Sequence, residues 1–336
     1  MEMSIVEQNT DSNLHTRPGK MIDCGRTDKS VAMERKHEWA VILTGGDGTR
    51  LKSLTRRITG DERPKQFCSV MGDQTLVEET RKRVALEVAR ERTLFLVNRL
   101  HEPYYSEILS DTPACNLIEQ PRNIGTAPAI LYSLMKIAAA DSQAVVAFFP
   151  SDHYVSDNTK FMAHIRRAFE AAHTRPDLMI LLGVEPESPE VEYGWIEPAQ
   201  AIEGHSQLHG VRRFWEKPCY GLAAVLQSRG CLWNSFVMIA SAEALIEIIA
   251  SATPALYNAF ASAMPWFGTD DEPAMMKELY ALLEETNFSD RVLALVPERL
   301  TVLKVSGIKW NDLGEPKRVL ASIQTAGARP CWTENC

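Results

Sequence analysis

Apolar runs alternate with amphipathic stretches along the first half of the chain. The runs predict buried strands at 39–44, 93–98, 115–119, 144–150 and 178–184. Apolar residues at helical spacing between them predict helices at 75–90, 126–140 and 158–173. Such alternation indicates an α/β protein, with a Rossmann-like, mixed but mostly parallel sheet that is flanked by helices on both faces.

The pattern changes after residue 185, where strands become shorter and polar turns more frequent. We expect strands at 191–197, 208–216, 232–240, 292–296 and 301–305. We expect helices near 220–229, 241–251 and 315–325, and a mostly helical stretch over 254–290. The organisation predicted is a flexible leader over 1–36, followed by one domain over 37–330 whose halves are 37–185 and 186–330. We expect no further domain after the last helix.

Composition and charge narrow the function. Of the 336 residues, 45% are hydrophobic and 24% charged, as in ordinary globular enzymes. A net charge of -8 argues against a nucleic-acid partner, which normally requires a basic surface. No apolar run approaches the ~20 residues that span a bilayer, so we expect no membrane partner. The seven cysteines are scattered without a C-x-x-C pair, which is typical of reduced thiols and predicts a cytoplasmic location.

The segment LTGGDGTRL over 43–51 follows the first predicted strand. Gly45, Gly46 and Gly48 place no Cβ in the turn, so backbone N–H groups can approach an anion closely. Thr49 and Arg50 follow, and a guanidinium group binds phosphate with a fork of donors. A plain connection between a strand and a helix is the alternative for a glycine-rich turn alone.

Three further charged residues lie in short motifs. Lys65 in PKQF follows a proline and precedes apolar residues, so we expect it to point into the protein, near the reacting phosphates. Asp152 in PSDH follows the strand 144–150, at the strand end where open α/β sheets bind ligands. A carboxylate there suits Mg²⁺, and we favour this role for Asp152 over that of a turn cap. Asp312 in WNDLG is either a second metal ligand or a turn-forming residue.

Three aromatic runs in the second half are rich in small polar groups: EYGWIE over 192–197, FWEKP over 214–218 and WNS over 233–235. Aromatic faces with nearby hydrogen-bonding groups suit a sugar. Gly194, Glu216 and Asn234 are therefore candidates for binding hydroxyl groups, and Lys217 for a sugar phosphate. Each run alone is explained as well by an aromatic core, but the three together favour a sugar pocket.

The order of these motifs resembles that of the sugar-1-phosphate nucleotidyltransferases, and most closely that of the mannose-1-phosphate guanylyltransferases. GGDGTRL, PKQF, EQPRNIGTAPA (119–129), PSDH, EYGWIEP, FWEKP, WNSF and KWNDLG carry the resemblance, which extends over about 38–325. It implies that 37–185 bind a nucleotide and that 186–330 bind a sugar phosphate and fold onto that half. The implied reaction joins a sugar 1-phosphate to a nucleoside triphosphate, with Mg²⁺ as cofactor and pyrophosphate as the second product.

The resemblance also implies roles for individual residues. The nucleotide would be bound by Gly45, Gly46, Gly48, Thr49, Gly125, Thr126 and Ala127. The catalytic residues would be Arg50, Lys65 and Asp152, with Asp152 and Asp312 as the metal ligands. The sugar phosphate would be bound by Gly194, Glu216, Lys217 and Asn234. The resemblance leaves the oligomeric state undecided between a monomer and a homodimer.

Departures from the family's motifs leave the substrates open. Ile124 and Gly125 interrupt the Arg-Asn-Thr-Ala-Pro-Ala of many guanylyltransferases, whereas Pro128 stands where uridylyltransferases often have histidine. Phe236 occupies the glycine position of Trp-Asn-Ser-Gly-Met, and Gly314-Glu315-Pro316 stand in place of a late Gly-Ser-Trp. GTP with mannose 1-phosphate is the expected pair, and UTP or dTTP with glucose 1-phosphate is the alternative. A kinase of the GGDGT type and a catalytically silent regulatory homologue are rival hypotheses.

Overall fold

The computed structural model describes residues 35–333, and residues 1–34 of the expected leader lie outside the described residues. The strands are β1 (Glu38–Leu43), β2 (Thr93–Asn98), β3 (Leu117–Gln120), β4 (Val145–Pro150), β5 (Tyr154–Val155), β6 (Met179–Val184), β7 (Trp195–Ile202), β8 (His205–Trp215), β9 (Leu232–Ser241), β10 (Leu300–Val305) and β11 (Trp310–Asn311). The helices are α2 (Lys52–Thr59), α3 (Leu76–Val84), α4 (Glu102–Tyr105), α5 (Thr126–Ala140), α6 (Asn158–Thr174), α7 (Tyr220–Ser228), α8 (Ala242–Ala252), α9 (Pro254–Ala263), α10 (Glu272–Leu282) and α11 (Pro316–Ala326). None of these helices is long and apolar enough to cross a bilayer.

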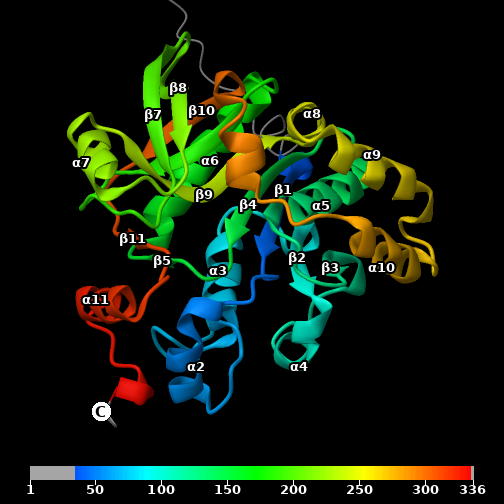
Figure 1. Ribbon diagram of the computed structural model, residues 1–336, viewed down its shortest axis with the longest axis horizontal. Coiled ribbons are helices and arrows are strands. Elements are labelled where there is room, and N and C mark those ends of the chain that lie inside the picture. The colour runs from blue at the N-terminus through cyan, green and yellow to red at the C-terminus, as the bar shows by residue number, and fades with distance from the viewer. Residues whose placement is uncertain (1–34, 334–336) are drawn as a thin grey trace, which may run out of the picture.

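One nine-stranded sheet runs through the described part of the chain, in the order β3-β2-β1-β4-β9-β6-β10-β8-β7 (Figure 1). β1 is parallel to both of its neighbours, β2 and β4, and β6 is parallel to β10. β9 runs antiparallel between β4 and β6, and β8 antiparallel between β10 and β7. The sheet is thus mixed and largely parallel, as predicted, and it contains strands from both halves of the sequence.

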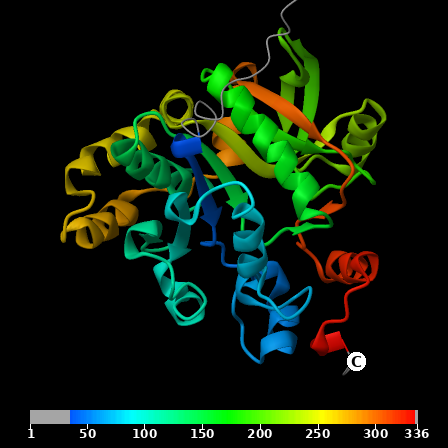
Figure 2. The same cartoon turned by 180° about the vertical axis from the view of Figure 1, so that it is seen from behind.

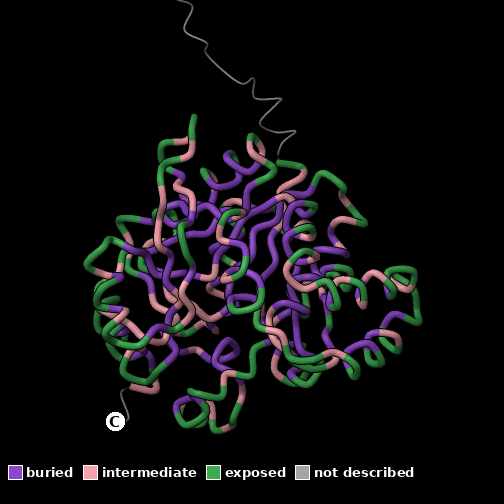
Figure 3. Tube along the Cα trace, turned by 45° about the horizontal axis from the view of Figure 1, so that its top comes forward, coloured by how far each residue is buried: buried purple, intermediate pink, exposed green. Residues whose placement is uncertain are grey.

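Helices cover both faces of the sheet because its strands are apolar on both sides. Val41 of β1 belongs to the buried cluster that contains residues of α5, α8, α9 and α10. Its neighbours Ala40 and Ile42 belong to the opposite cluster, with residues of α3 and α6. α6 lies across the face that is turned to the viewer in Figure 2. Figure 3 shows the buried segments gathered in the middle of the molecule. Alternate side chains of a strand therefore serve two cores.

Three predicted elements differ clearly from the structure, and one of them is the strand expected at 191–197, which begins only at Trp195 and continues to Ile202. The predicted strand at 292–296 is wrong, because Ser289–Leu293 form a π-helical turn. The Asn287 carboxamide oxygen accepts the N–H groups of Ser289 (2.8 Å) and Asp290 (3.3 Å) and so starts the turn. The helix predicted to reach residue 90 ends at Val84, since the chain then turns to bury Val88. The short α2, α4, β5 and β11 were not predicted.

Candidate active site

An open cleft of about 340 Å³ lies at the carboxyl ends of β1 and β4. From β1 the chain builds β2 and β3 on one side and then crosses to β4 on the other, so the cleft lies at a topological switch point. Nine of the predicted site residues border it: Gly46, Arg50, Thr126, Asp152, Gly194, Glu216, Lys217, Asn234 and Asp312. The structure thus brings together residues that are far apart in the sequence.

The glycine loop after β1 uses its glycines for different reasons. Gly48 has φ 58°, in the left-handed region that favours glycine. A Cβ on Gly45 would lie 2.2 Å from the Gln120 side-chain nitrogen, so a larger residue there would displace that side chain. Gly46 has open space around it. The Gln66 side-chain amide donates to the carbonyl groups of Thr44 (2.9 Å) and Gly46 (2.8 Å), which fixes the loop against the PKQF segment.

Lys65 is buried, with 7% of its surface exposed, and points into the site as the motif predicted. Its ammonium group lies 3.2 Å from the Asp152 carboxylate. It also donates to the Leu313 carbonyl at 3.2 Å and to the Asp312 carbonyl. A buried cation is costly unless it is paired, and these three oxygens pair it. Lys65 therefore joins the loops that follow β4 and β11.

Asp312 reaches the cleft through a small second sheet. β11 pairs with β5, with Trp310 opposite Val155 and Asn311 opposite Tyr154, so the segment after β11 returns beside the segment after β4. The Asp312 carboxylate accepts the Gly314 N–H (2.8 Å). The turn-forming alternative is thus correct for its backbone, but the same carboxylate also borders the cleft.

The Asp312 carboxylate has several further partners. It accepts the Tyr193 hydroxyl at 3.2 Å and lies 3.3 Å from the Arg318 guanidinium. Burial raises the pKa of this carboxyl, but the charges of Lys65 and Arg318 outweigh burial and hold the pKa below its usual value. Asp312 is accordingly ionised at neutral pH.

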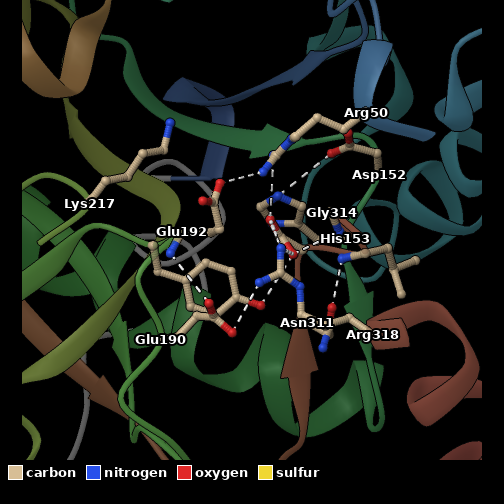
Figure 4. Close-up of polar contacts among 12 residues, drawn as sticks. Arg50, Asp152, His153, Glu190, Glu192, Lys217, Asn311, Gly314 and Arg318 are labelled. Carbon is tan, nitrogen blue, oxygen red and sulfur yellow. Dashed lines mark hydrogen bonds and ion pairs between the residues drawn. The ribbon is translucent and has the colours of Figure 1, made fainter. Parts of the chain in front are cut away.

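Arg50 extends across the cleft toward acidic residues. Its guanidinium lies 2.9 Å from the Glu192 carboxylate and 3.9 Å from that of Asp312. Figure 4 shows Arg50, Glu192 and Asp152 converging on one space. The Arg50–Glu192 pair is half exposed, and such pairs contribute only about 0–1 kcal/mol. Arg50 can therefore exchange Glu192 for a phosphate group at little cost.

Arg318 is a site residue that the sequence reasoning missed. It lies in the first turn of α11, pairs with Glu190 at 3.1 Å and covers the Tyr193 ring at 4.9 Å. A cation near a helix N-terminus opposes the helix dipole and needs compensation, which Asp312 and Glu190 provide. Lys317 and Arg318 directly after Pro316 were the only available signal in the sequence.

The opposite wall of the cleft carries the predicted sugar residues. Asn234 donates its backbone N–H to the Gly194 carbonyl at 2.8 Å. A Cβ on Gly194 would lie 2.8 Å from the Phe214 ring and 3.0 Å from the Glu216 carboxylate, so glycine is required for this approach. The Lys217 ammonium lies 3.6 Å from Glu216. Burial raises the pKa of Glu216, although Lys217 partly opposes that effect.

The loop before α5 is tied to a distant segment. Ala127 donates its N–H to the Thr286 carbonyl at 3.1 Å, and the Thr126 hydroxyl accepts the Phe288 N–H at 2.9 Å. A Cβ on Gly125, which has φ 93°, would lie 2.4 Å from the Thr286 carbonyl oxygen. Thr126 borders the cleft, whereas Ala127 is fully buried in the core.

His153 borders the same cleft beside Asp152. Its ring packs edge-on against Trp310, with centroids 5.2 Å apart. Burial lowers its pKa to about 4, although Asp152 opposes that effect, so the ring is neutral at pH 7. It is therefore a poor candidate for a charged group that binds phosphate.

Backbone strain marks the same region independently of the motifs. Among residues 35–333, the non-glycine residues with positive φ are Lys217 (43°), Phe236 (59°) and Leu313 (50°). Lys217 and Phe236 border the cleft, and Leu313 follows Asp312. Strained backbone persists where its surroundings enforce it, and it concentrates at functional sites.

Asp152 and Asp312 have the donor chemistry that Mg²⁺ requires. Residues 35–333 contain no group of three metal-binding side chains. Mg²⁺ nevertheless needs only one or two carboxylates when phosphate oxygens and water supply its other ligands. Both carboxylates border one cleft, and Asp312 is held in its ionised form. The residues present fit a metal that binds together with a phosphate ligand.

Comparisons with known proteins agree on one family for this chain. A model of the nucleotidyl transferase family matches residues 39–327. The alginate biosynthesis protein AlgA of Pseudomonas aeruginosa is 30% identical over 283 residues, which cover 82% of this chain and 56% of AlgA. Mannose-1-phosphate guanylyltransferase of Salmonella muenchen is 29% identical over 283 residues, covering 82% of this chain and 57% of that protein. The chain spans about half the length of these relatives.

Solved structures agree with this fold. The structure named mannose-1-phosphate geranyltransferase, from Thermus thermophilus, superimposes with a TM-score of 0.72 at 28% identity, and the match covers 83% of this chain and 76% of that chain. A UDP-glucose pyrophosphorylase complexed with UDP-glucose gives a TM-score of 0.53 at 15% identity. The match covers 86% of this chain and 97% of that chain, and it shows a common fold only.

Proposed function

Because the chain belongs to the nucleotidyl transferase family, we propose that it joins mannose 1-phosphate to GTP and releases GDP-mannose and pyrophosphate. Relatives named mannose-1-phosphate guanylyltransferase, 28% and 29% identical to the chain, support this choice of substrates. In this proposal 37–185 form the nucleotide-binding half and 186–330 the sugar-phosphate-binding half, and the enzyme acts in the cytoplasm. UTP or dTTP with glucose 1-phosphate is the alternative pair.

The observation that supports the proposal best is that Asp152 and Asp312 border one cleft and that the buried Lys65 contacts both residues from behind it. The reaction brings two phosphate groups together, and its barrier arises largely from their mutual repulsion. A buried cation paired with the Asp152 carboxylate, and bound to the backbone beside the second carboxylate of Asp312, is a suitable arrangement for positioning phosphates beside a divalent metal. Asp152 and Asp312 would hold Mg²⁺, which when bound would neutralise charge on the triphosphate.

The residues of this chain would act by positioning and by charge. Arg50 would leave Glu192 and bind the triphosphate, while N–H groups of the glycine loop, with Gly45, Gly46, Gly48 and Thr49, bind it from the other side. Gly125, Thr126 and Ala127 would lie along the base and ribose.

The sugar phosphate would bind on the facing wall. Its phosphate, bound to Lys217, would attack the α-phosphorus in line, and the bond to pyrophosphate would break. A phosphate monoester has a second pKa near ~6, so it is already ionised at neutral pH and needs no general base.

A pyrophosphate-release assay tests the proposal. Five nucleoside triphosphates would be crossed with mannose, glucose and N-acetylglucosamine 1-phosphates in the presence of Mg²⁺. We expect the fastest release from GTP with mannose 1-phosphate. Faster release with UTP or dTTP and glucose 1-phosphate would replace the substrates but keep the chemistry. Release of a nucleoside diphosphate instead of pyrophosphate would indicate a kinase, and binding without turnover would indicate a regulatory homologue.

A further inference from the structure

Phe236 adopts a backbone conformation that suits glycine. Its φ of 59° lies in the left-handed region, where a bulky side chain costs free energy. The family's motif has glycine at this position, so the ring is a feature of this chain. A strained residue persists only where the structure or a ligand gives it a reason.

A bulge in β9 holds Phe236 in this conformation. Leu181 and Gly183 of β6 pair with Met238 and Asn234 of β9, so that two steps along β6 face four along β9. The Asn234 carboxamide oxygen accepts the Phe236 N–H at 3.1 Å. A bulge of this kind re-aims a side chain, and here it turns Phe236 toward the cleft.

Core packing alone does not explain the ring. Phe236 is only partly buried; it packs against the edge of the core, where its ring meets Phe288 edge-on with centroids 6.4 Å apart. It borders the same cleft as Glu216, Lys217 and Asn234. An apolar ring in a polar wall provides a surface for the C–H face of a sugar, while polar neighbours bind its hydroxyl groups.

Asn234 supports the same assignment. Its carboxamide oxygen is occupied by the Phe236 N–H, which leaves its NH₂ group as a donor beside the ring. A hydroxyl oxygen and a C–H face are adjacent on a pyranose. We propose that Phe236 packs against the C–H face of the bound sugar, and that its bulk selects hexose 1-phosphates over N-acetylhexosamine 1-phosphates. This inference rests on the proposed function.

Ring-removing and ring-retaining variants test it. Phe236→Gly and Phe236→Asn remove the ring and tolerate positive φ, whereas Phe236→Tyr keeps the ring. Tyr220→Ala, which truncates an aromatic side chain that is 68% exposed outside the cleft, is the off-site control. Calorimetric titrations would use mannose, glucose and N-acetylglucosamine 1-phosphates, with Mg²⁺ and a GTP analogue that has a methylene group between the α- and β-phosphorus atoms.

We expect Phe236→Gly and Phe236→Asn to lose about fivefold in affinity for the hexose phosphates. Their affinity for the GTP analogue should change by less than about twofold. The ratio of the affinity for N-acetylglucosamine 1-phosphate to the affinity for the hexose phosphates should rise. Phe236→Tyr and Tyr220→Ala should resemble the parent protein. Unchanged hexose affinity, a loss confined to the nucleotide, or an unchanged ratio between the sugars would overturn the inference.

The outcomes also separate this inference from the proposed function. If the parent protein binds hexose phosphates through Phe236 but releases no pyrophosphate, the inference stands and the proposed reaction fails. If the parent binds no sugar phosphate, both fail.

Discussion

The two walls of the cleft use the same unusual backbone conformation with different residues. On the wall from the first half of the chain, left-handed φ values fall on glycines, Gly48 (58°) and Gly125 (93°). On the facing wall they fall on Lys217 and Phe236, and a third falls on the buried Leu313, directly after Asp312. The first wall is thus shaped without strain, whereas the second holds residues with side chains in a conformation that they rarely adopt.

Asparagine side chains enforce part of this strain. The Asn234 oxygen accepts the N–H of Phe236, and the Asn311 oxygen accepts the N–H of Leu313 at 2.7 Å, two residues later in each case. Such turns are local, so the residues they position can be exchanged without rebuilding the sheet. Within the proposed function, we expect the first wall to be fixed and the facing wall to be adjustable.

The largest effect is expected at the ion pair between Lys65 and Asp152. Lys65→Ala and Asp152→Asn each break the 3.2 Å ion pair that joins the loops and should lower kcat at least ~100-fold. Steady-state pyrophosphate release measures this. Lys304→Ala, which removes a half-exposed lysine of β10, is the matched control and should retain kcat. Near-normal turnover in either variant would remove that residue from the proposed site.

Gly125→Ala tests whether the first wall truly needs glycine. The added Cβ would lie 2.4 Å from the Thr286 carbonyl oxygen at a φ of 93°, so unfolding free energy should fall by about 2 kcal/mol. Denaturant unfolding measures the change. Gly204→Ala is the matched control, because its φ is 78° but nothing lies near its Cβ, and it should cost less. Equal losses would show that φ alone matters.

Glu216→Gln should separate stability from binding on the second wall. Burial raises the pKa of Glu216, so stability falls as pH rises from 4.5 through the pKa of the folded state. The amide has no charge to desolvate, and its melting temperature should therefore exceed that of the parent at pH 7. KM for the sugar phosphate should rise about tenfold, because a neutral amide accepts a hydrogen bond from a sugar hydroxyl less strongly than a carboxylate does. A lower melting temperature at pH 7 would contradict this account.

Lys217→Asn should give the smallest change in stability, and it tests directly whether the backbone of Lys217 is strained. The Lys217 side chain is about half exposed, at 51%, so its removal costs little packing. Asparagine tolerates positive φ, and the unfolding free energy should rise by up to about 1 kcal/mol while sugar-phosphate affinity falls. Calorimetric melting and titration measure the two effects. A loss of stability would mean that Lys217 is not strained.

Features with a local cause could be predicted from the sequence. The glycine loop, Lys65 and Asp152 each follow an apolar strand or a rigid proline, and the structure brings them together at the carboxyl ends of β1 and β4. The order of strands and helices was likewise predictable from the hydrophobic pattern, because the strands of the large sheet place apolar side chains in the cores on both of its faces.

Features with a tertiary cause could not be predicted. Arg318 joins the site only because Asp312 and Glu190 meet it, and Asp312 reaches the cleft only through the pairing of β11 with β5. The prediction of a strand at 292–296 was wrong because the Asn287 side chain starts a helical turn just before this segment. The adjacent buried residues Val292 and Leu293 belong to that turn.

The most direct test follows the phosphorus atoms of GTP, labelled at either the α- or the γ-phosphate, during one turnover with mannose 1-phosphate. Our account predicts that the α-label enters the nucleotide sugar and the γ-label leaves in pyrophosphate. A γ-label transferred to a sugar or another acceptor, with release of GDP, would contradict it.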